Sequence, residues 1–476
     1  MEASHRPQRG WSPPGRHSMF RIARVALAAT ASLIAMPLAA APLSAEESQA
    51  LREEVRALQA RLAAIEARLG EAPPGAAPAA ASAPAVTAAA AASAPATAIG
   101  WKGSPQFTSD DRSFKVKGRI QLDAGYVSKP RGIVDRGLGF SNEVRRIRLG
   151  GEGKLGSGFG YKLEVELSDN KVGLVDTFVT YDTGPWQVSI GNQNQFQSLD
   201  ELTGDTTGSL MERAAFTDAF NFERRLGIAV QYHRKDILLQ GGVFSDDIDA
   251  LADSSDGPNG GDENNSFSID GRAVYAPKLG GTQIHLGGSA HLRMLNRLSD
   301  APTRYRQRPF LHSTNSRILA TPNMLVDREF NYGLEVAAIH GRWHTAGEAN
   351  WLDAIGPGPN SRFFGGYAEV GYFLTDDTRT YRNGIFGGAK PSSPFGKGGI
   401  GAIQVNLRYD YLDLNDGAIR GGTQNGWFAG IIWTPVEYLR FNLNYGYLAY
   451  TGAAIPAGGR TDYGMHVGGA RVELDF

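Results

Sequence analysis

Apolar and polar residues alternate in segment after segment from about residue 115 to the C-terminus. In the stretch 161–167, apolar residues occupy every odd position, and Lys162, Glu164 and Glu166 lie between them. The stretches 403–411 and 441–447 repeat this pattern, with aliphatic and aromatic residues on the apolar side. Successive side chains of a strand point to opposite faces of a sheet, so this period of two predicts an all-β region whose strands have one apolar and one polar face.

A soluble β-sandwich and a transmembrane β-barrel both contain such strands, but the barrel turns its apolar face outward to lipid. The segments are about ten residues long, the length that a tilted strand needs to cross a bilayer. The final segment, 471–476, ends on Phe476, and a terminal aromatic strand is typical of outer-membrane proteins. The chain has 476 residues and no cysteine, and a closed sheet with paired backbone groups can hold it together without disulfides. These features favour the barrel.

The alternating region divides into sixteen candidate strands, an even number as bacterial barrels require. They begin near residues 116, 143, 159, 173, 186, 224, 237, 267, 282, 329, 342, 363, 402, 424, 438 and 463. Connections should then alternate between long ones outside and short ones on the periplasmic side. The segment 375–399 breaks this rule, because it is long at a periplasmic position. Either that turn is truly long or one strand is misplaced.

The first 45 residues have the pattern of a secretory signal peptide. A basic start at 19–24 precedes the apolar stretch 25–41, and Leu43, Ser44 and Ala45 offer a cleavage site before Glu46. Residues 1–18 are polar and basic. Either Met19 is the true initiator, or the basic region is unusually long.

Two further segments precede the barrel. In residues 46–71 the apolar positions recur at spacings of four and three, at Leu51, Val55, Leu58, Leu62, Ile65 and Leu69. This heptad pattern predicts a short coiled coil, and a single docked amphipathic helix is the alternative. Residues 72–104 are rich in Ala and Pro and predict an extended linker. The predicted fold is therefore a sixteen-stranded antiparallel transmembrane β-barrel over residues 105–476, preceded by a coiled-coil helix and a Pro/Ala linker.

Three separated blocks resemble the phosphate-selective porin O and P family, in the same order. They are 196–202 (FQSLDEL) with 211–214 (MERA), then 407–416 (LRYDYLDLND), then 433–435 (WTP) with 440–445 (RFNLNY). The resemblance covers roughly residues 105–476. It implies a homotrimer of barrels in outer-membrane lipid, each with its own pore. It also implies a third extracellular loop that folds inward to narrow the pore, here residues 194–223.

The family's selective members line their pores with arginines, so the resemblance makes inward-facing arginines candidate anion ligands. By strand phase the candidates are Arg119, Arg146, Arg148, Arg225, Arg293 and Arg408, and in the long loop 295–328 they are the alternating Arg304, Arg306 and Arg308. Alternation in an extended segment places the last three on one side. Arg145 falls on the outward phase, so it is expected to point away from the lumen.

The expected constriction loop departs from the selective channels, which use lysine at their narrowest point. It has no lysine, and its charged residues include Asp200, Glu201, Asp205, Glu212 and Asp218 against a single Arg213. The resemblance therefore implies an outer-membrane porin for small anions such as phosphate or polyphosphate, without strict phosphate selectivity. Fixed cations in a narrow wet channel would raise the local anion concentration.

Two other readings stay open. A sugar or general-diffusion porin with a periplasmic coiled coil would show an aromatic track along its pore, and a surface-attached adhesin would use the coiled coil as a stalk. In the porin reading, that coil could contact the cell wall.

The dinucleotide-like stretch 151–156 lies between two strands and predicts a hairpin, and 413–417 lacks a full calcium loop. With a net charge of -1, we expect no nucleic-acid partner, and we expect no metal, no cofactor and no enzymatic activity.

Overall fold

A computed structural model describes residues 97–168, 170–246, 248, 266–295 and 303–476. The predicted signal peptide, the coiled coil and most of the linker lie outside these residues. The sheet begins at Ala98, inside the segment predicted as linker, because β1 (Ala98–Trp101) pairs with β2 (Pro105–Ser109). No helix among the described residues is long and apolar enough to cross a membrane.

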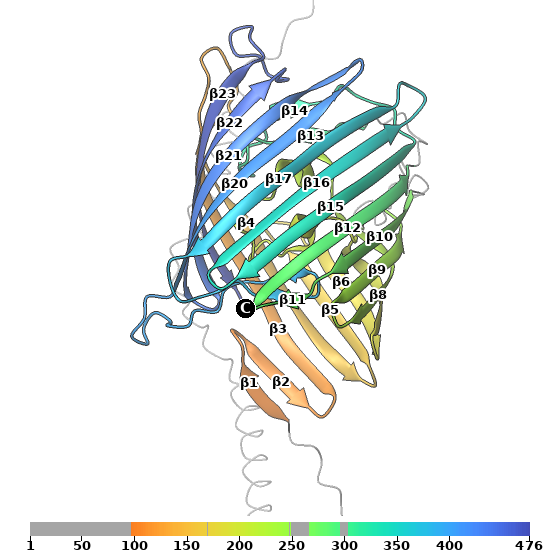
Figure 1. The fold of residues 1–476 in the computed structure, drawn as a ribbon, viewed down its shortest axis with the longest axis vertical. Helices are drawn as coiled ribbons and strands as arrows, with labels where there is room; N and C mark the ends of the chain where they lie inside the picture. The colour runs from red at the N-terminus through yellow and green to blue at the C-terminus, as the bar shows by residue number, and fades with distance from the viewer. Residues whose placement is uncertain (1–96, 169, 247, 249–265, 296–302) are drawn as a thin grey trace, which may run out of the picture. The chain divides into compact units, whose positions relative to one another are not determined.

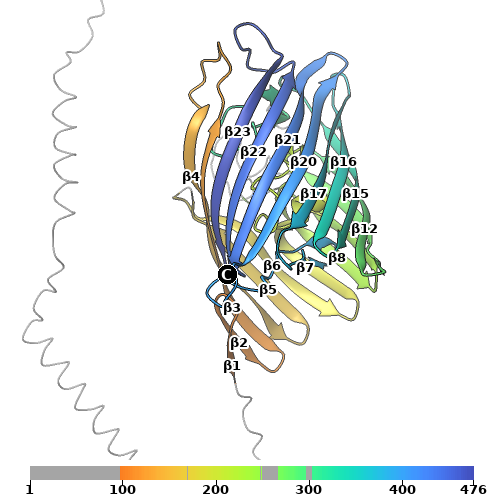
Figure 2. The same ribbon diagram turned by 60° about the vertical axis from the view of Figure 1, so that its left-hand side comes forward.

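Sixteen strands of the described residues form a closed antiparallel barrel, seen from two sides in Figure 1 and Figure 2. They are β3 (Arg112–Val127), β4 (Gly139–Gly156), β5 (Phe159–Glu166), β6 (Gly173–Thr183), β7 (Trp186–Asn194), β8 (Arg224–Arg234), β9 (Ile237–Phe244), β10 (Phe267–Tyr275), β12 (Thr282–Met294), β15 (Arg328–His340), β16 (Trp343–Ile355), β17 (Ser361–Phe373), β20 (Ala402–Asp416), β21 (Ile419–Val436), β22 (Leu439–Thr451) and β23 (Tyr463–Asp475). Each pairs with its neighbours in sequence, and β23 pairs with β3 to close the sheet. The predicted strand number is confirmed, and most strands begin at or next to the predicted residue.

The remaining elements are short. The hairpin β1–β2 extends β3 below the barrel (Figure 1), and β11 (Lys278–Leu279) precedes β12. Two further hairpins are formed by β13 (Arg306–Gln307) with β14 (Leu319–Ala320), and by β18 (Tyr381–Arg382) with β19 (Ile385–Phe386). The described helices α3 (Leu199–Leu202) and α4 (Ala215–Ala219) both lie in the connection between β7 and β8.

The outer face is apolar and is bordered by aromatic residues near both ends of the strands. One group of ring contacts consists of Phe159–Tyr181, Trp186–Tyr232, Trp343–Tyr372 and Trp433–Phe441, and the other consists of Tyr332–Trp351, Phe364–Tyr411 and Tyr409–Trp427. Between the two groups lie exposed aliphatic side chains such as Leu163, Ile228, Leu334 and Leu407. An apolar band between two aromatic girdles is the outer surface of a barrel that spans a membrane.

The rim that carries Phe476, called the terminal rim below, has mostly two-residue turns, at 157–158, 184–185, 235–236, 341–342 and 437–438. The connection 374–401 lies at the same rim because it joins β17 to β20. It is a truly long turn, and no strand is misplaced there. Part of it turns into the barrel, where the carbonyl of Gly384 accepts from Arg272 Nη2 at 2.8 Å and Tyr381 Oη lies 2.6 Å from His285 Nδ1.

Candidate pore constriction

The connection 195–223 between β7 and β8, called the inward loop below, lies inside the barrel. Leu199, Leu210, Phe216 and Phe220 are buried in one apolar cluster with residues of the barrel's inner face. Phe216 stacks on Tyr367 of β17 with ring centroids 6.4 Å apart. Because buried aliphatic and aromatic side chains attach it to the wall, the loop occupies part of the lumen, as expected for residues 194–223.

Polar groups of the wall hold the backbone of the inward loop. Glu348 of β16 accepts hydrogen bonds from the N–H groups of Leu199 and Asp200, at 3.0 and 2.6 Å. Asp410 of β20 accepts from Ala215 at 2.9 Å. The first N–H groups of a helix have no partner within the helix, so these carboxylates satisfy the starts of α3 and α4. The path of the loop is therefore fixed at several points.

Asp205 joins the inward loop to two arginines of the wall. Its Oδ1 lies 2.5 Å from Nη1 of Arg119 on β3, and its Oδ2 lies 2.9 Å from Nε of Arg146 on β4. Burial alone would raise the pKa of Asp205, but Arg146 and Arg119 outweigh it and hold the pKa well below its usual range. The carboxylate is therefore ionised at neutral pH.

Glu212 makes a second link of the same kind. Its Oε1 lies 2.6 Å from Nη2 of Arg471 on β23 and 3.5 Å from Nε of Arg145. Burial would raise the pKa of Glu212, but Arg145 and Arg471 lower it to about 2.

The outward position expected for Arg145 is wrong. Opposite Gln121 and Leu122, the register of β4 shifts between Arg146 and Val144, so Arg145 is the extra residue of a β-bulge. Val144 and Ile147 on either side remain exposed on the outer face, while Arg145 and Arg146 both reach the inward loop. A bulge re-aims a side chain in this way.

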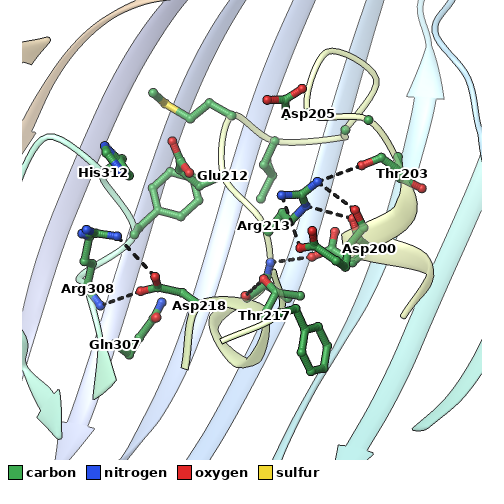
Figure 3. Close-up of a pocket in the computed structure, with 18 of the residues that line it drawn as sticks. Asp200, Thr203, Asp205, Glu212, Arg213, Thr217, Asp218, Gln307, Arg308 and His312 are labelled. Atoms are coloured by element: carbon green, nitrogen blue, oxygen red, sulfur yellow. Dashed lines mark hydrogen bonds and ion pairs between the residues drawn. The ribbon is translucent and has the colours of Figure 1, made fainter. Parts of the chain in front are cut away.

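Two more charged residues of the loop are paired. Asp200 Oδ1 lies 3.5 Å from Nη2 of Arg408, which binds Glu369 of β17 more closely, at 2.8 Å. Arg213 stays within the loop: it lies 3.3 Å from Glu201 and donates to the carbonyls of Asp200, Glu201 and Thr203 (Figure 3).

The six strand arginines proposed as pore-lining all lie on the inner face, and each has a carboxylate oxygen within 2.5–2.9 Å. The partners are Asp205 for Arg119 and Arg146, Glu166 for Arg148, Asp246 for Arg225 and Arg293, and Glu369 for Arg408. Sequence reasoning missed these pairings, which join residues from 18 positions apart, for Arg148 and Glu166, to 86 positions apart, for Arg119 and Asp205. The wall therefore has much less free positive charge than a count of its arginines suggests.

A second connection, 303–327, also packs inside the barrel. Its apolar side chains reach the inner wall, with Tyr305 against Phe363 at 5.2 Å and Phe310 against Phe428 at 4.6 Å between ring centroids. The predicted alternation is present: Arg304 and Arg306 are exposed, and Tyr305 between them is buried. Arg304 donates to the carbonyl of Thr321.

Arg308 marks the point where the two inner connections meet. Its Nη1 lies 3.3 Å from Asp218 on α4 (Figure 3). Arg317, which sequence reasoning missed, lies in the same cluster: burial and the neighbouring Arg308 and Arg306 lower its pKa to about 10, against the opposing effect of Asp218. Nε of Arg308 and both Nε and Nη1 of Arg317 are buried without a hydrogen-bond partner among the described residues. Arg317 follows a polar stretch without periodicity, so no sequence signal marks it.

The inward loop, β4 and the connection 303–327 enclose a cavity of about 200 Å³. Its charged lining is Arg145, Arg146, Arg213, Arg308 and Arg408 together with Asp200, Glu201, Asp205, Glu212, Glu223 and Asp218, and many of these appear in Figure 3. No group of three or more His, Asp or Glu residues among the described residues is arranged to hold a metal ion. The cavity is polar and dense in charges of both signs.

A closed sixteen-stranded barrel with an apolar outer band and an inward loop defines an outer-membrane porin. The profile of the family Phosphate-selective porin O and P matches residues 114–476, and the chain belongs to this family. Among curated proteins, an uncharacterized protein of Caulobacter vibrioides is 64% identical over 381 residues, which cover 80% of this chain and 77% of that protein.

The solved structures similar to this chain include outer-membrane proteins of several bacteria. OmpT of Vibrio cholerae matches with 12% identity and a TM-score of 0.49, over 78% of this chain and 99% of that one. The anion-selective porin from Comamonas acidovorans matches with 14% identity and a TM-score of 0.47, over 77% and 100%. The outer-membrane channel DcaP of Acinetobacter baumannii matches with 13% identity and a TM-score of 0.43, over 78% and 99%.

Proposed function

We propose that this porin is a passive diffusion channel for small anions, with phosphate among them but without strict phosphate selectivity. The observation that carries the proposal is the cluster of Arg306, Arg308 and Arg317, which faces one carboxylate, Asp218. Several guanidinium N–H groups of this cluster have no partner among the described residues. Fixed cations with free donors raise the local concentration of anions and repel cations.

The paired arginines of the wall argue for modest selectivity. Arg119, Arg146 and Arg408 are each held by a carboxylate, so they add less field than free cations would. A passing anion would still meet polarised N–H groups, but it would have to share them with protein carboxylates. Strong binding of one anion is therefore not expected, which agrees with the absence of lysine from the inward loop.

A general-diffusion or sugar porin is the second candidate. The pairing of the wall arginines with carboxylates is the observation that favours it, because paired charges select weakly between anions and cations. An aromatic track would support sugar transport. The aromatic side chains of the barrel instead lie mainly in the two outer girdles, and Phe216, Phe220, Tyr305 and Phe310 are buried where the inner connections attach. Sugar passage is therefore less well supported than anion passage.

The family and the barrel favour the outer membrane as the location. We propose that the terminal rim faces the periplasm, and that residues 46–71 form a periplasmic coiled coil available for cell-wall contact. We also propose a homotrimer, packed through outward-facing apolar side chains.

Single-channel recordings with exchanged salts test the proposed function. Replacing potassium by a bulky organic cation at constant chloride should leave most of the conductance, because anions carry the current. Replacing chloride by a bulky organic anion at constant potassium should remove most of it. The reverse pattern would contradict an anion channel, and equal losses would favour the general-diffusion alternative.

A further inference from the structure

Arg119 and Arg146 form a two-pronged site on the inner wall. They lie on the adjacent strands β3 and β4, where Gln121 is directly opposite Arg146. Each guanidinium contacts a different oxygen of the same carboxylate, that of Asp205. Two guanidinium groups that share the oxygens of one anion are an arrangement in which proteins bind carboxylate and phosphate. The wall therefore presents an oxyanion site, and a residue of the protein itself occupies it.

Asp205 lies on the inward loop rather than on the wall that forms the site. The neighbouring Thr206 donates to Asp475 at 2.9 Å, and Arg440 donates to the carbonyl of Gly208 at 2.9 Å, so the loop is held to the wall directly after the carboxylate. Asp205 lines the cavity of about 200 Å³, and Thr206 lines a second cavity of about 220 Å³ near the terminal rim. The charged lining of the second cavity is Lys115, Lys117, Lys390 and Arg440 together with Glu437, Glu473 and Asp475. Asp205 and its neighbour Thr206 therefore line two different cavities, each with charged residues of both signs.

The other loop carboxylates do not occupy comparable sites. Glu212 shares Arg471 with Asp123, which would still neutralise that guanidinium if Glu212 were uncharged. Arg408, the partner of Asp200, is likewise neutralised by Glu369. In contrast, the other hydrogen-bond partner of Arg146 in the described residues is the neutral amide of Gln121, at 2.9 Å. Arg119 also contacts Asp475, with Nη2 3.3 Å from Oδ1. Removing the charge of Asp205 would therefore leave Arg146, but not Arg119, without a bonded carboxylate.

We propose that Asp205 is a tethered occupant of an oxyanion site formed by Arg119 and Arg146, and that it keeps permeating oxyanions from being held there. This inference rests on the proposed passage of anions. A group attached to the protein competes at an effective concentration of millimolar or higher, so it displaces free anions at ordinary concentrations. The native pore then releases oxyanions quickly, and the charge of Asp205 sets how tightly it binds them.

The test is block of chloride current by inorganic phosphate in planar bilayers, in the native protein and in Asp205→Asn. We expect phosphate to block the variant at a concentration lower by about tenfold or more, which corresponds to about 1.4 kcal/mol. The double variant Arg146→Gln with Asp205→Asn should lose this gain. The matched control is Asp353→Asn, because Asp353 also pairs with an arginine, Arg362 at 2.6 Å, but on the outer face. It should be blocked like the native protein.

Equal phosphate block of the native channel and of a folded, conducting Asp205→Asn variant would overturn the inference. If this variant does not assemble, Asp205→Ser removes the same charge and is judged by the same criterion. A native channel that prefers potassium over chloride would overturn the proposed function instead. The role of Asp205 as a tethered occupant would still be decided by whether phosphate blocks the Asp205→Asn variant at a lower concentration than the native protein.

Discussion

Arg471 on the last strand lies directly opposite Asp123 on the first, and its guanidinium donates to both carboxylate oxygens at 2.7 Å. The same guanidinium contacts Glu212 of the inward loop at 2.6 Å. One buried side chain therefore connects the seam that closes the barrel with the loop that narrows it. This contact makes the stability of the barrel and the position of the constriction depend on each other.

Replacing Arg471 by methionine should destabilise the barrel strongly. The substitution leaves Asp123 and Glu212 buried without their shared guanidinium, and removing one partner of a buried ion pair costs about 3–5 kcal/mol. Urea unfolding in lipid or detergent measures the change in the free energy of unfolding. Arg362→Met is the control, because the Arg362–Asp353 pair is exposed on the outer face and its loss should change little. Equal losses in the two variants would contradict a special role for the seam.

The contribution of Glu212 to stability should depend on pH in a defined direction. Its pKa falls from 4.5 to about 2 in the folded protein, so the folded state favours the ionised form. The stability that Glu212 adds, measured as the difference between the native protein and Glu212→Gln, should be full above about pH 4.5, decline below it and vanish under about pH 2. Urea unfolding at several pH values tests this. A difference that grew on acidification would show that the link to Arg471 and Arg145 is not the main interaction.

Deleting Arg145 should leave an assembled barrel. Val144 faces outward and Arg146 inward, so alternation across the deletion remains regular once the bulged residue is gone. Deleting Gly150, which is paired in the regular part of β4, would instead move the rest of the strand onto the wrong face. Heat-modifiable migration on a gel reports assembly. Failure of the Arg145 deletion together with success of the Gly150 deletion would show that the bulge is misplaced.

Replacing Arg306, Arg308 and Arg317 together by alanine should lower chloride conductance by roughly twofold or more, because the excess positive charge of the cluster over Asp218 is lost. No barrel strand depends on these residues, so the variant should assemble. Arg131, Arg136 and Arg460 lie on exposed rim connections and, replaced together by alanine, provide the control. Similar conductance of both triple variants would indicate that the cluster lies away from the ion path.

The strands were predictable because their signal is local and repeated. Each strand shows its own alternation, as in 161–167, and a one-residue slip would turn charged residues toward lipid. The inward phase of Arg119 and Arg408 follows from the same rule. Arg145 shows the limit of this alternation rule. A single extra residue changes which face its side chain points to, and nothing in the composition of β4 marks that residue.

The constriction was less predictable, because its contacts are not local. Asp205 and Arg119 are 86 residues apart in the sequence, and Glu212 and Arg471 are 259 apart. Sequence alone suggested that the acidic inward loop opposes the arginines of the wall. In the folded protein, Asp205 and Glu212 of the loop pair with Arg119, Arg146 and Arg471. The other wall arginines pair mainly with carboxylates outside the loop. Arg317 was missed because it lies in an irregular connection without periodicity.

The sign of the reversal potential across a KCl gradient tests the central claim most directly. The fixed guanidinium groups of Arg306, Arg308 and Arg317 should make chloride more permeant than potassium in the native channel. We therefore expect a reversal potential shifted toward the equilibrium potential of chloride. A shift toward the equilibrium potential of potassium would contradict it, and would mean that the carboxylates of the inward loop dominate the field of the pore.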